Sequence, residues 1–170
     1  MDNTPKGNRL HIALLGRTNV GKSSLLNLML GQDIAITSPV AGTTTDVVEK
    51  AMELLPLGPV LFLDTAGLDD ISELSGARLK KTAKVFDRAD VVILVTEPDN
   101  WTDFEESVLT ESKKLHIPVL IVINKIDLRQ PSAGYLKLLS QKSSRILTVS
   151  CNDESKRQSY LENLKKQLLE

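Results

Sequence analysis

Residues 10–27, LHIALLGRTNVGKSSLLN, join an apolar run to a helix-like segment through a turn rich in glycine and polar residues. The run Leu10–Leu15 is short and hardly alternates with polar residues, which is typical of a strand buried on both faces of a parallel sheet. A buried strand that leads directly into a helix indicates an α/β fold. The polar turn between them needs a chemical explanation, because a simple connection does not require these residue types.

The rest of the chain repeats this alternation of strands and helices. Four further apolar runs follow, at Val60–Leu63, Val91–Val95, Val119–Ile123 and Ile146–Val149, and helix-like segments lie at Arg78–Arg88, Asp103–Leu115, Tyr135–Leu139 and around Leu161, Leu164 and Leu168. Asp46–Leu55 breaks the alternation, because PLGP at residues 56–59 turns it directly into the second run as a hairpin. We expect a three-layer α/β/α fold with a six-stranded, mostly parallel sheet and one antiparallel strand.

Composition limits the class of protein. The chain has 170 residues, one cysteine and a formal net charge of −1. We expect a flexible tail over residues 1–9 and one domain over residues 10–170. A single cysteine favours a reducing compartment, here the cytoplasm, and no apolar run has the length of a membrane span. Because no long basic stretch is present, we expect neither a nucleic-acid nor a membrane partner.

The turn itself matches G-x-x-x-x-G-K-[ST] in the required position between a strand and a helix. Its glycines allow successive backbone N–H groups to point at phosphate oxygens, and the helix that follows adds its positive N-terminal dipole. The expected cradle comprises Gly16, Arg17, Thr18, Asn19, Val20, Gly21, Lys22, Ser23 and Ser24. Lys22 would reach the β- and γ-phosphates and Ser23 would ligate Mg²⁺. A glycine-rich turn with a solvated lysine is the alternative interpretation.

Asn124-Lys125-Ile126-Asp127, directly after the fourth run, indicates which base is bound. The carboxylate of Asp127 can accept two parallel hydrogen bonds from N1–H and the exocyclic amine of guanine, and adenine lacks both donors there. Asn124 would join this segment to the phosphate-binding turn, and the stem of Lys125 would cover one face of the base. A polar loop that caps a strand is the alternative for this motif alone.

Three shorter motifs complete the expected site. Asp64, at the end of a strand, would hold Mg²⁺ through water, and Gly67 of DTAG would offer its N–H to the γ-phosphate. Within GTTTD at residues 42–46, Thr43 and Thr44 are candidates near the phosphates, with the Thr44 hydroxyl completing the Mg²⁺ shell, although three threonines could also simply begin a strand. Backbone N–H groups of Ser150 and Cys151 could donate to the guanine carbonyl. The Cys151 thiol itself is expected to be a buried bystander.

In order and spacing, GRTNVGKS, GTTTD, DTAG, NKID and VSC resemble the five motifs of the translation-factor-related small GTPases, in the group that includes Era, Der and the tRNA-modifying TrmE. The resemblance implies a Mg²⁺-dependent GTPase that converts GTP to GDP and phosphate and switches conformation as it does so. The group offers two alternative functions. One is an Era-like or Der-like role in ribosome assembly or tRNA modification, and the other is that of the cytosolic part of a ferrous-iron transporter.

Three stretches are more similar still to the HydF family of [FeFe]-hydrogenase maturation: residues 4–24, residues 38–60 with the MELLPLGP hairpin, and LDTAGLDD at residues 63–70. This resemblance implies a role in assembly of the hydrogenase cluster, with other maturases and the hydrogenase as partners. Members also carry a dimerisation segment and an iron-sulfur cluster domain. The single cysteine here implies no such cluster, so the expectation is an isolated GTPase domain of a longer protein, or loss of the cluster function.

The resemblance also suggests how hydrolysis proceeds. Leu68 occupies the position at which Ras-like enzymes place a water-orienting glutamine; Asp69, Asp70 and Glu73 are weaker candidates for that task. An asparagine at the position of Asn19 resembles the potassium-activated subset, in which K⁺ bound by this side chain stabilises the transition state. The implied catalytic set is Lys22, Asn19, Thr44 and Gly67, with slow turnover. Arg17 is expected to be solvated on the rim of the turn.

Overall fold

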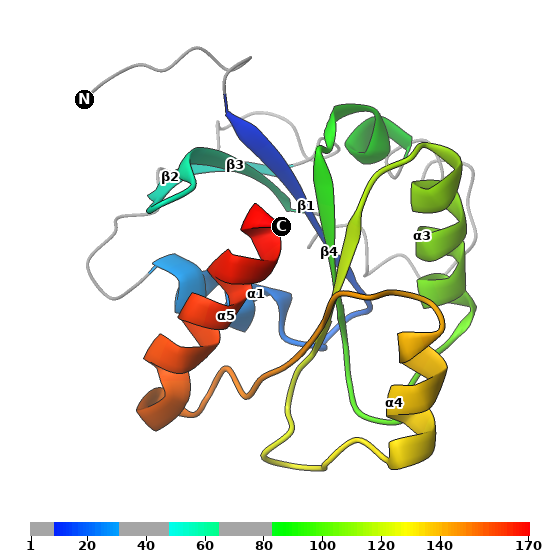
Figure 1. Cartoon of the computed structure of the whole chain (residues 1–170). Helices are drawn as coiled ribbons and strands as arrows, with labels where there is room; N and C mark the ends of the chain where they lie inside the picture. The colour runs from blue at the N-terminus through cyan, green and yellow to red at the C-terminus, as the bar shows by residue number, and fades with distance from the viewer. Residues whose placement is uncertain (1–8, 31–47, 65–82) are drawn as a thin grey trace.

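The computed structural model describes residues 9–30, 48–64 and 83–170. In these ranges six strands form one sheet in the order β2-β3-β1-β4-β5-β6 (Figure 1). The strands are β1 (Leu10–Gly16), β2 (Val48–Leu54), β3 (Gly58–Asp64), β4 (Val91–Thr96), β5 (Val119–Ile123) and β6 (Ile146–Thr148). β2 pairs antiparallel with β3, and the remaining neighbours pair parallel. The predicted mostly parallel sheet with one antiparallel strand is confirmed.

The central strand β1 is covered on both faces. Its successive side chains alternate, so that Ile12 and Leu14 join one hydrophobic cluster and Ala13 and Leu15 join another on the opposite face. All four side chains are at most 2% exposed. A strand with two buried faces needs apolar residues at successive positions, which explains why apolar and polar residues hardly alternate in this run.

Helices cover both faces of the sheet (Figure 1). On one face α1 (Lys22–Leu30) and α5 (Arg157–Leu169) contribute Leu25 and Leu164 to the same cluster as Ile12. On the other, α3 (Asp103–Lys114), α4 (Ala133–Ser140) and a helical segment at residues 83–88 pack through Val108, Leu139 and Val85, respectively. A short 3₁₀ helix, η3 (Glu154–Lys156), precedes α5. The predicted three layers are therefore present.

The helices begin in two different ways. At α3, Thr102 and Glu105 form a reciprocal capping box, and the first turn holds the acidic residues Asp103, Glu105 and Glu106. At α1 the first turn contains no acidic residue. The positive end of α1 is therefore not compensated by a carboxylate within its own first turn, which favours an anion at that end.

Most predicted boundaries agree with the structure within one or two residues. β6 ends at Thr148 rather than Val149, although the Val149 N–H still donates to the Ile123 carbonyl at 2.8 Å. α4 extends beyond Tyr135–Leu139 because Ser132 caps it and accepts from the Tyr135 N–H. Residues 1–8 of the predicted tail and the start of the predicted helix Arg78–Arg88 lie outside the described residues.

Candidate nucleotide site

The sequence motifs that the structure describes meet at the carboxyl edge of the parallel strands. β1 ends at Gly16, β3 ends at Asp64, β5 leads into Asn124, and β6 is followed by Val149 and Ser150. Because these strands run in one direction, their carboxyl ends and the following loops lie at one edge of the sheet. Ligands of open α/β sheets bind at such an edge. The topology therefore gathers segments that are more than a hundred residues apart into one site.

The phosphate-loop turn, defined here as residues 16–21, requires glycine at both ends for steric reasons. A Cβ added to Gly16 would lie 2.7 Å from the Val95 carbonyl oxygen and 2.8 Å from Cγ2 of Val20. A Cβ added to Gly21 would lie 2.1 Å from Nδ2 of Asn124, and the φ angle of Gly21 is +101°. Asn19 also has a positive φ, of 65°, a conformation that asparagine adopts more readily than most residues. The turn is curled as an anion cradle requires.

Lys22 begins α1 and is only 6% exposed. Its ammonium donates to the carbonyl oxygens of Gly16, at 2.5 Å, and Arg17, at 3.4 Å. The positive charge therefore lies over the backbone of the turn, beside the end of α1 that carries no acidic residue in its first turn. Ser23, the next residue, is exposed. The cationic group and the hydroxyl that the motif predicts both lie at the start of this helix.

The side-chain amide of Asn124 joins three motifs. Its Nδ2 donates to the Val20 carbonyl at 3.0 Å, and its Oδ1 accepts from the Cys151 N–H at 3.2 Å. Asn124 is 2% exposed, so both hydrogen bonds are shielded from water. The predicted connection between this segment and the phosphate-loop turn is present. In this structure the Cys151 N–H donates within the protein, and its donation to a guanine carbonyl stays a prediction.

Asp127 is held next to the last motif. Ser150 donates its hydroxyl to Asp127 Oδ1 at 2.7 Å, while Asp127 itself is exposed. The neighbouring Cys151 is partly buried, and burial, followed by the negative charge of Asp127, raises the pKa of its thiol to about 11. The thiol therefore stays neutral near pH 7, as expected of a bystander.

Lys125 contacts both the phosphate-loop turn and the residue that follows β4. Its ammonium donates to the Asn19 carbonyl and to Glu97 Oε1, the latter at 2.6 Å. That the stem of this lysine covers a base stays a prediction; the structure shows that its charged end binds the turn. Glu97 was missed by sequence reasoning, because an isolated glutamate after a strand carries no pattern.

Asp64 ends β3 and is 4% exposed. Its Oδ2 lies 3.1 Å from Nζ of Lys50, on the adjacent β2, a partner that the sequence did not indicate. A buried carboxylate that already attracts an ammonium also suits a divalent cation. Together with the hydroxyl of Ser23 it supplies the hard oxygen donors that Mg²⁺ prefers, so these residues fit the ion.

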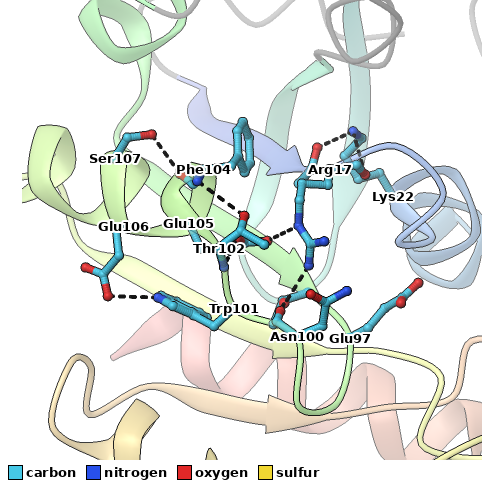
Figure 2. A network of polar contacts seen from close by, with 12 residues as sticks. Arg17, Lys22, Glu97, Asn100, Trp101, Thr102, Phe104, Glu105, Glu106 and Ser107 are labelled. Atoms are coloured by element: carbon cyan, nitrogen blue, oxygen red, sulfur yellow. Dashed lines mark hydrogen bonds and ion pairs between the residues drawn. The ribbon is translucent and has the colours of Figure 1, made fainter. Parts of the chain in front are cut away.

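Arg17 is not a solvated residue on the rim, which corrects the prediction. Its Nε lies 2.5 Å from Oε1 of Glu105, whose side chain is fully buried, and its Nη2 donates to the Asn100 carbonyl at 3.0 Å (Figure 2). A buried carboxylate must be paired, and Arg17 is the partner that it requires. Sequence reasoning missed Glu105 because its spacing from Thr102 indicates only a helix cap.

Several predicted residues lie outside the described residues. These are Thr43 and Thr44 of the GTTTD motif, Gly67 of DTAG, the candidate switch segment Leu68–Gly76, and Leu68, Asp69, Asp70 and Glu73 within it. In the part of the chain that is described, no helix combines the length and apolar character needed to cross a membrane.

Comparison with known proteins defines the class to which this fold and site belong. Residues 11–125 match the family described as 50S ribosome-binding GTPases, and the chain belongs to this family. Over 134 residues it is 40% identical to the tRNA modification GTPase MnmE of Prochlorococcus marinus (strain NATL1A), covering 75% of this chain and 28% of MnmE. It is 37% identical over 124 residues to GTPase Der of Wolinella succinogenes, covering 71% of this chain and 26% of Der.

Solved structures agree with this class. Aquifex aeolicus Era bound to GDP and AlF₄⁻ superposes with a TM-score of 0.66 and 27% identity, covering 92% of this chain and 56% of Era. The G domain of the FeoB iron transporter of T. maritima matches in fold, with a TM-score of 0.67 and 22% identity over 95% of this chain and 98% of that domain. The chain is therefore a P-loop GTPase domain of the Era/Der/TrmE-like group that binds guanine nucleotide. It spans about 28% of the length of the MnmE proteins that it matches.

A pair of glycine substitutions tests the geometry of the turn. Gly21→Ala forces a Cβ into Asn124 and into an unfavourable φ, so we expect a loss of about 1 kcal/mol or more in the free energy of unfolding and about tenfold weaker GTP binding. The matched control is Gly134→Ala in α4, where nothing lies within 4 Å of the added Cβ and a gain of about 0.4–1 kcal/mol is expected. Urea unfolding and titration with fluorescent GTP measure both. Equal effects of the two substitutions would contradict the assigned contact.

Proposed function

We propose that this domain binds GTP across the carboxyl edge of its sheet and hydrolyses it to GDP and phosphate as a molecular switch. The observation that carries the proposal is the pair of hydrogen bonds made by Asn124, to the Val20 carbonyl and the Cys151 N–H. These contacts hold the phosphate-binding turn beside the segments that recognise the base. A phosphate cradle and a base site in fixed relation are what a nucleoside triphosphate needs.

At the phosphate end, the proposed ligands are backbone N–H groups of residues 16–24 and the Lys22 ammonium. Lys22 now donates to the Gly16 and Arg17 carbonyls, so the ammonium is already held above the turn. A phosphate oxygen offers the ammonium a hydrogen bond in which both donor and acceptor are charged. This bond is stronger than the present hydrogen bonds to neutral carbonyls. Ser23, Thr44 and Asp64 are the proposed Mg²⁺ ligands; when bound, the ion neutralises charge that develops between the β- and γ-phosphates.

At the base end, Asp127 is the proposed guanine receptor. The Ser150 hydroxyl occupies one of its oxygens at 2.7 Å, which orients the carboxylate while leaving the residue exposed. An oriented carboxylate can accept from N1–H and the exocyclic amine of guanine together. Inosine triphosphate lacks that amine and retains N1–H, so it isolates one of the two hydrogen bonds.

Base specificity gives a direct test of the role of Asp127. The unchanged protein should bind GTP about tenfold or more tightly than ITP, because one charge-assisted hydrogen bond is lost with the amine. Asp127→Ala should weaken GTP binding by about 30-fold or more and bring the affinities for GTP and ITP to within about twofold of each other. Isothermal titration calorimetry measures all four affinities. A variant that still prefers GTP as strongly as the parent would exclude Asp127 as the receptor.

For hydrolysis we propose that K⁺ supplies charge at the phosphates, with Asn19 as one ligand. Asn19 is exposed, has a φ of 65°, and is fixed through its carbonyl by the Lys125 ammonium. The backbone that carries the amide is therefore held in one conformation. A cation held beside the phosphates would stabilise the transition state without a partner protein.

The potassium proposal predicts a dependence on the monovalent salt. GTP turnover should rise on the order of tenfold or more when Na⁺ is replaced by K⁺ at constant ionic strength, and Asn19→Ala should abolish most of that rise. Phosphate release under multiple turnover provides the rates. Equal turnover of the parent protein in the two salts would refute the potassium proposal while leaving GTP binding intact.

For the role in the cell, the relatives favour an RNA-linked process as the first candidate. The matched proteins include tRNA modification GTPases, and a neighbouring structure is Era in complex with MgGDPNP and nucleotides 1506–1542 of 16S ribosomal RNA. The net charge of −1 alone is therefore not a sufficient reason to exclude a nucleic-acid partner. Because the chain spans about 28% of MnmE, RNA contacts outside this domain would not appear in its charge.

A second candidate, hydrogenase maturation, is favoured by the β2–β3 hairpin. Its MELLPLGP sequence resembles the HydF family, and the turn joins the end of β2 to the start of β3. Since the site lies at the carboxyl end of β3, this turn lies at the opposite end of the sheet. Nucleotide chemistry does not dictate the sequence of this turn, and packing does not dictate Leu55, which is 66% exposed. Common descent therefore explains the likeness to the HydF family better than shared chemistry does.

Deletion of the gene in a host that makes hydrogenase separates the two candidates. An RNA-linked role predicts altered tRNA nucleosides or ribosome profiles with unchanged hydrogenase activity, because the protein would act only on RNA. A maturation role predicts the reverse. Mass spectrometry of tRNA nucleosides, sucrose gradients and a hydrogen-evolution assay measure the outcomes, and a strain unchanged in all three would contradict both candidates.

A further inference from the structure

We propose that Glu105 is a positioning residue for nucleotide binding, because through Arg17 it fixes the start of the phosphate-loop turn against the segment between β4 and α3. The inference rests on the proposed binding of GTP by this turn. Glu105 lies in the first turn of α3, and its side chain is fully buried. It makes no contact that a sequence motif for GTP binding would predict.

The guanidinium of Arg17 is fully engaged by this segment (Figure 2). Nε lies 2.5 Å from Glu105 Oε1, and Nη2 donates to the Asn100 backbone carbonyl at 3.0 Å. With the amide oxygen of Asn100 turned toward it, Nη1 also has an acceptor at 3.0 Å. All three nitrogens of the planar group therefore have an acceptor, which fixes both its position and its orientation. Arg17 is directed away from phosphate chemistry and acts as a tether.

Glu105 is itself held rigidly. Its Oε2 accepts from the Thr102 N–H at 2.8 Å and from the Thr102 hydroxyl at 2.6 Å, while Oε1 faces Arg17. Both carboxylate oxygens are thus occupied, one by the start of α3 and the other by the turn. Because the carboxylate is fixed to the capped start of α3, it also restricts the movement of the phosphate-loop turn, which it contacts through Arg17.

The turn needs such a tether when a phosphate arrives. The Lys22 ammonium donates to the Gly16 and Arg17 carbonyls. A phosphate would draw that ammonium away from those carbonyls, at a point where Asn19 and Gly21 already occupy positive φ values. The side chain of Arg17 does not depend on Lys22. It continues to hold the turn in the curled shape that directs backbone N–H groups inward.

Trp101 provides an optical signal from this segment. It is the only tryptophan in the sequence and lies between Asn100 and Thr102, two of the residues in the network. Its indole N–H donates to Glu106 Oε1 at 2.9 Å, and the Lys142 ammonium lies 5.9 Å from the ring centroid. Its emission therefore reports whether the segment stays folded in each variant.

The test is Glu105→Gln in the full 170-residue chain. Glutamine can serve in a capping box, so α3 keeps a cap, but the charge that pairs with Arg17 is removed. We expect GTP and GDP to bind about tenfold more weakly, with α3 still formed. Val108→Ala is the matched control, because Val108 is a buried residue of the same helix outside the network. It should lower the urea midpoint while leaving nucleotide affinity within about twofold.

A double variant separates positioning from stability and covers the case in which Glu105→Gln does not fold. Arg17→Met with Glu105→Leu replaces the buried ion pair by apolar groups, which often restores stability. We expect its urea midpoint to return close to that of the parent while GTP affinity stays about tenfold lower.

Two results overturn the proposal: parental GTP affinity in a folded Glu105→Gln protein, or recovery of affinity together with stability in the double variant. Failure of the unchanged chain to bind GTP refutes the proposed function instead, so the two failures are distinguishable. Titration with fluorescent GTP and GDP supplies the affinities, and Trp101 emission together with circular dichroism verifies the fold of every variant.

Discussion

The parallel pairing of β1 with β3 on one side and β4 on the other is the constraint on which the site depends. Register fixes Leu14 opposite Asp64 in β3 and Gly16 opposite Val95 in β4. Because β1 is buried on both faces, a one-residue shift along its neighbours would exchange its side chains between two closely packed clusters, which would leave cavities and overpacked positions. The turn after Gly16 therefore starts from a fixed point, with Asp64 at the end of the adjacent strand. Hydrophobic packing of β1 therefore determines the geometry of the site.

Charge compensation within the chain is the second feature that shapes the site. Lys22 contacts backbone carbonyls, Lys50 pairs with Asp64, Arg17 pairs with Glu105, and Lys125 pairs with Glu97. Groups expected to face phosphate or metal thus have partners of their own in this state. Binding of a nucleotide with its metal would exchange several of these contacts for stronger ones, and Arg17 differs because its partner is fully buried. Of the two cationic residues at the phosphate-loop turn and the start of α1, Lys22 can therefore be released and Arg17 is retained.

The sequence predicted the architecture well because apolar runs and turn residues are local patterns, and it predicted the contact of Asn124 because this residue belongs to a recognisable motif. Val, Ile and Leu runs identified the buried strands, PLGP identified the hairpin, and the amide of Asn124 bonds to the phosphate-loop turn as expected. Glu105, Glu97 and Lys50 were not predicted. Their functions arise from contacts between residues 88, 28 and 14 positions apart in the sequence, which only the three-dimensional fold brings together. Arg17 was misjudged for the same reason, since a long cationic side chain on a loop is usually solvated.

The contact between Gly21 and Asn124 has a consequence for how such a domain can change over time. Any side chain at position 21 would occupy the space of the Asn124 amide, since its Cβ would lie 2.1 Å from Nδ2. Positions 21 and 124 therefore cannot diversify separately. Asp127 is not subject to this coupling, because it is exposed and bonded only to Ser150 among the contacts described. The two ends of the proposed nucleotide site therefore differ in how freely their residues can be replaced.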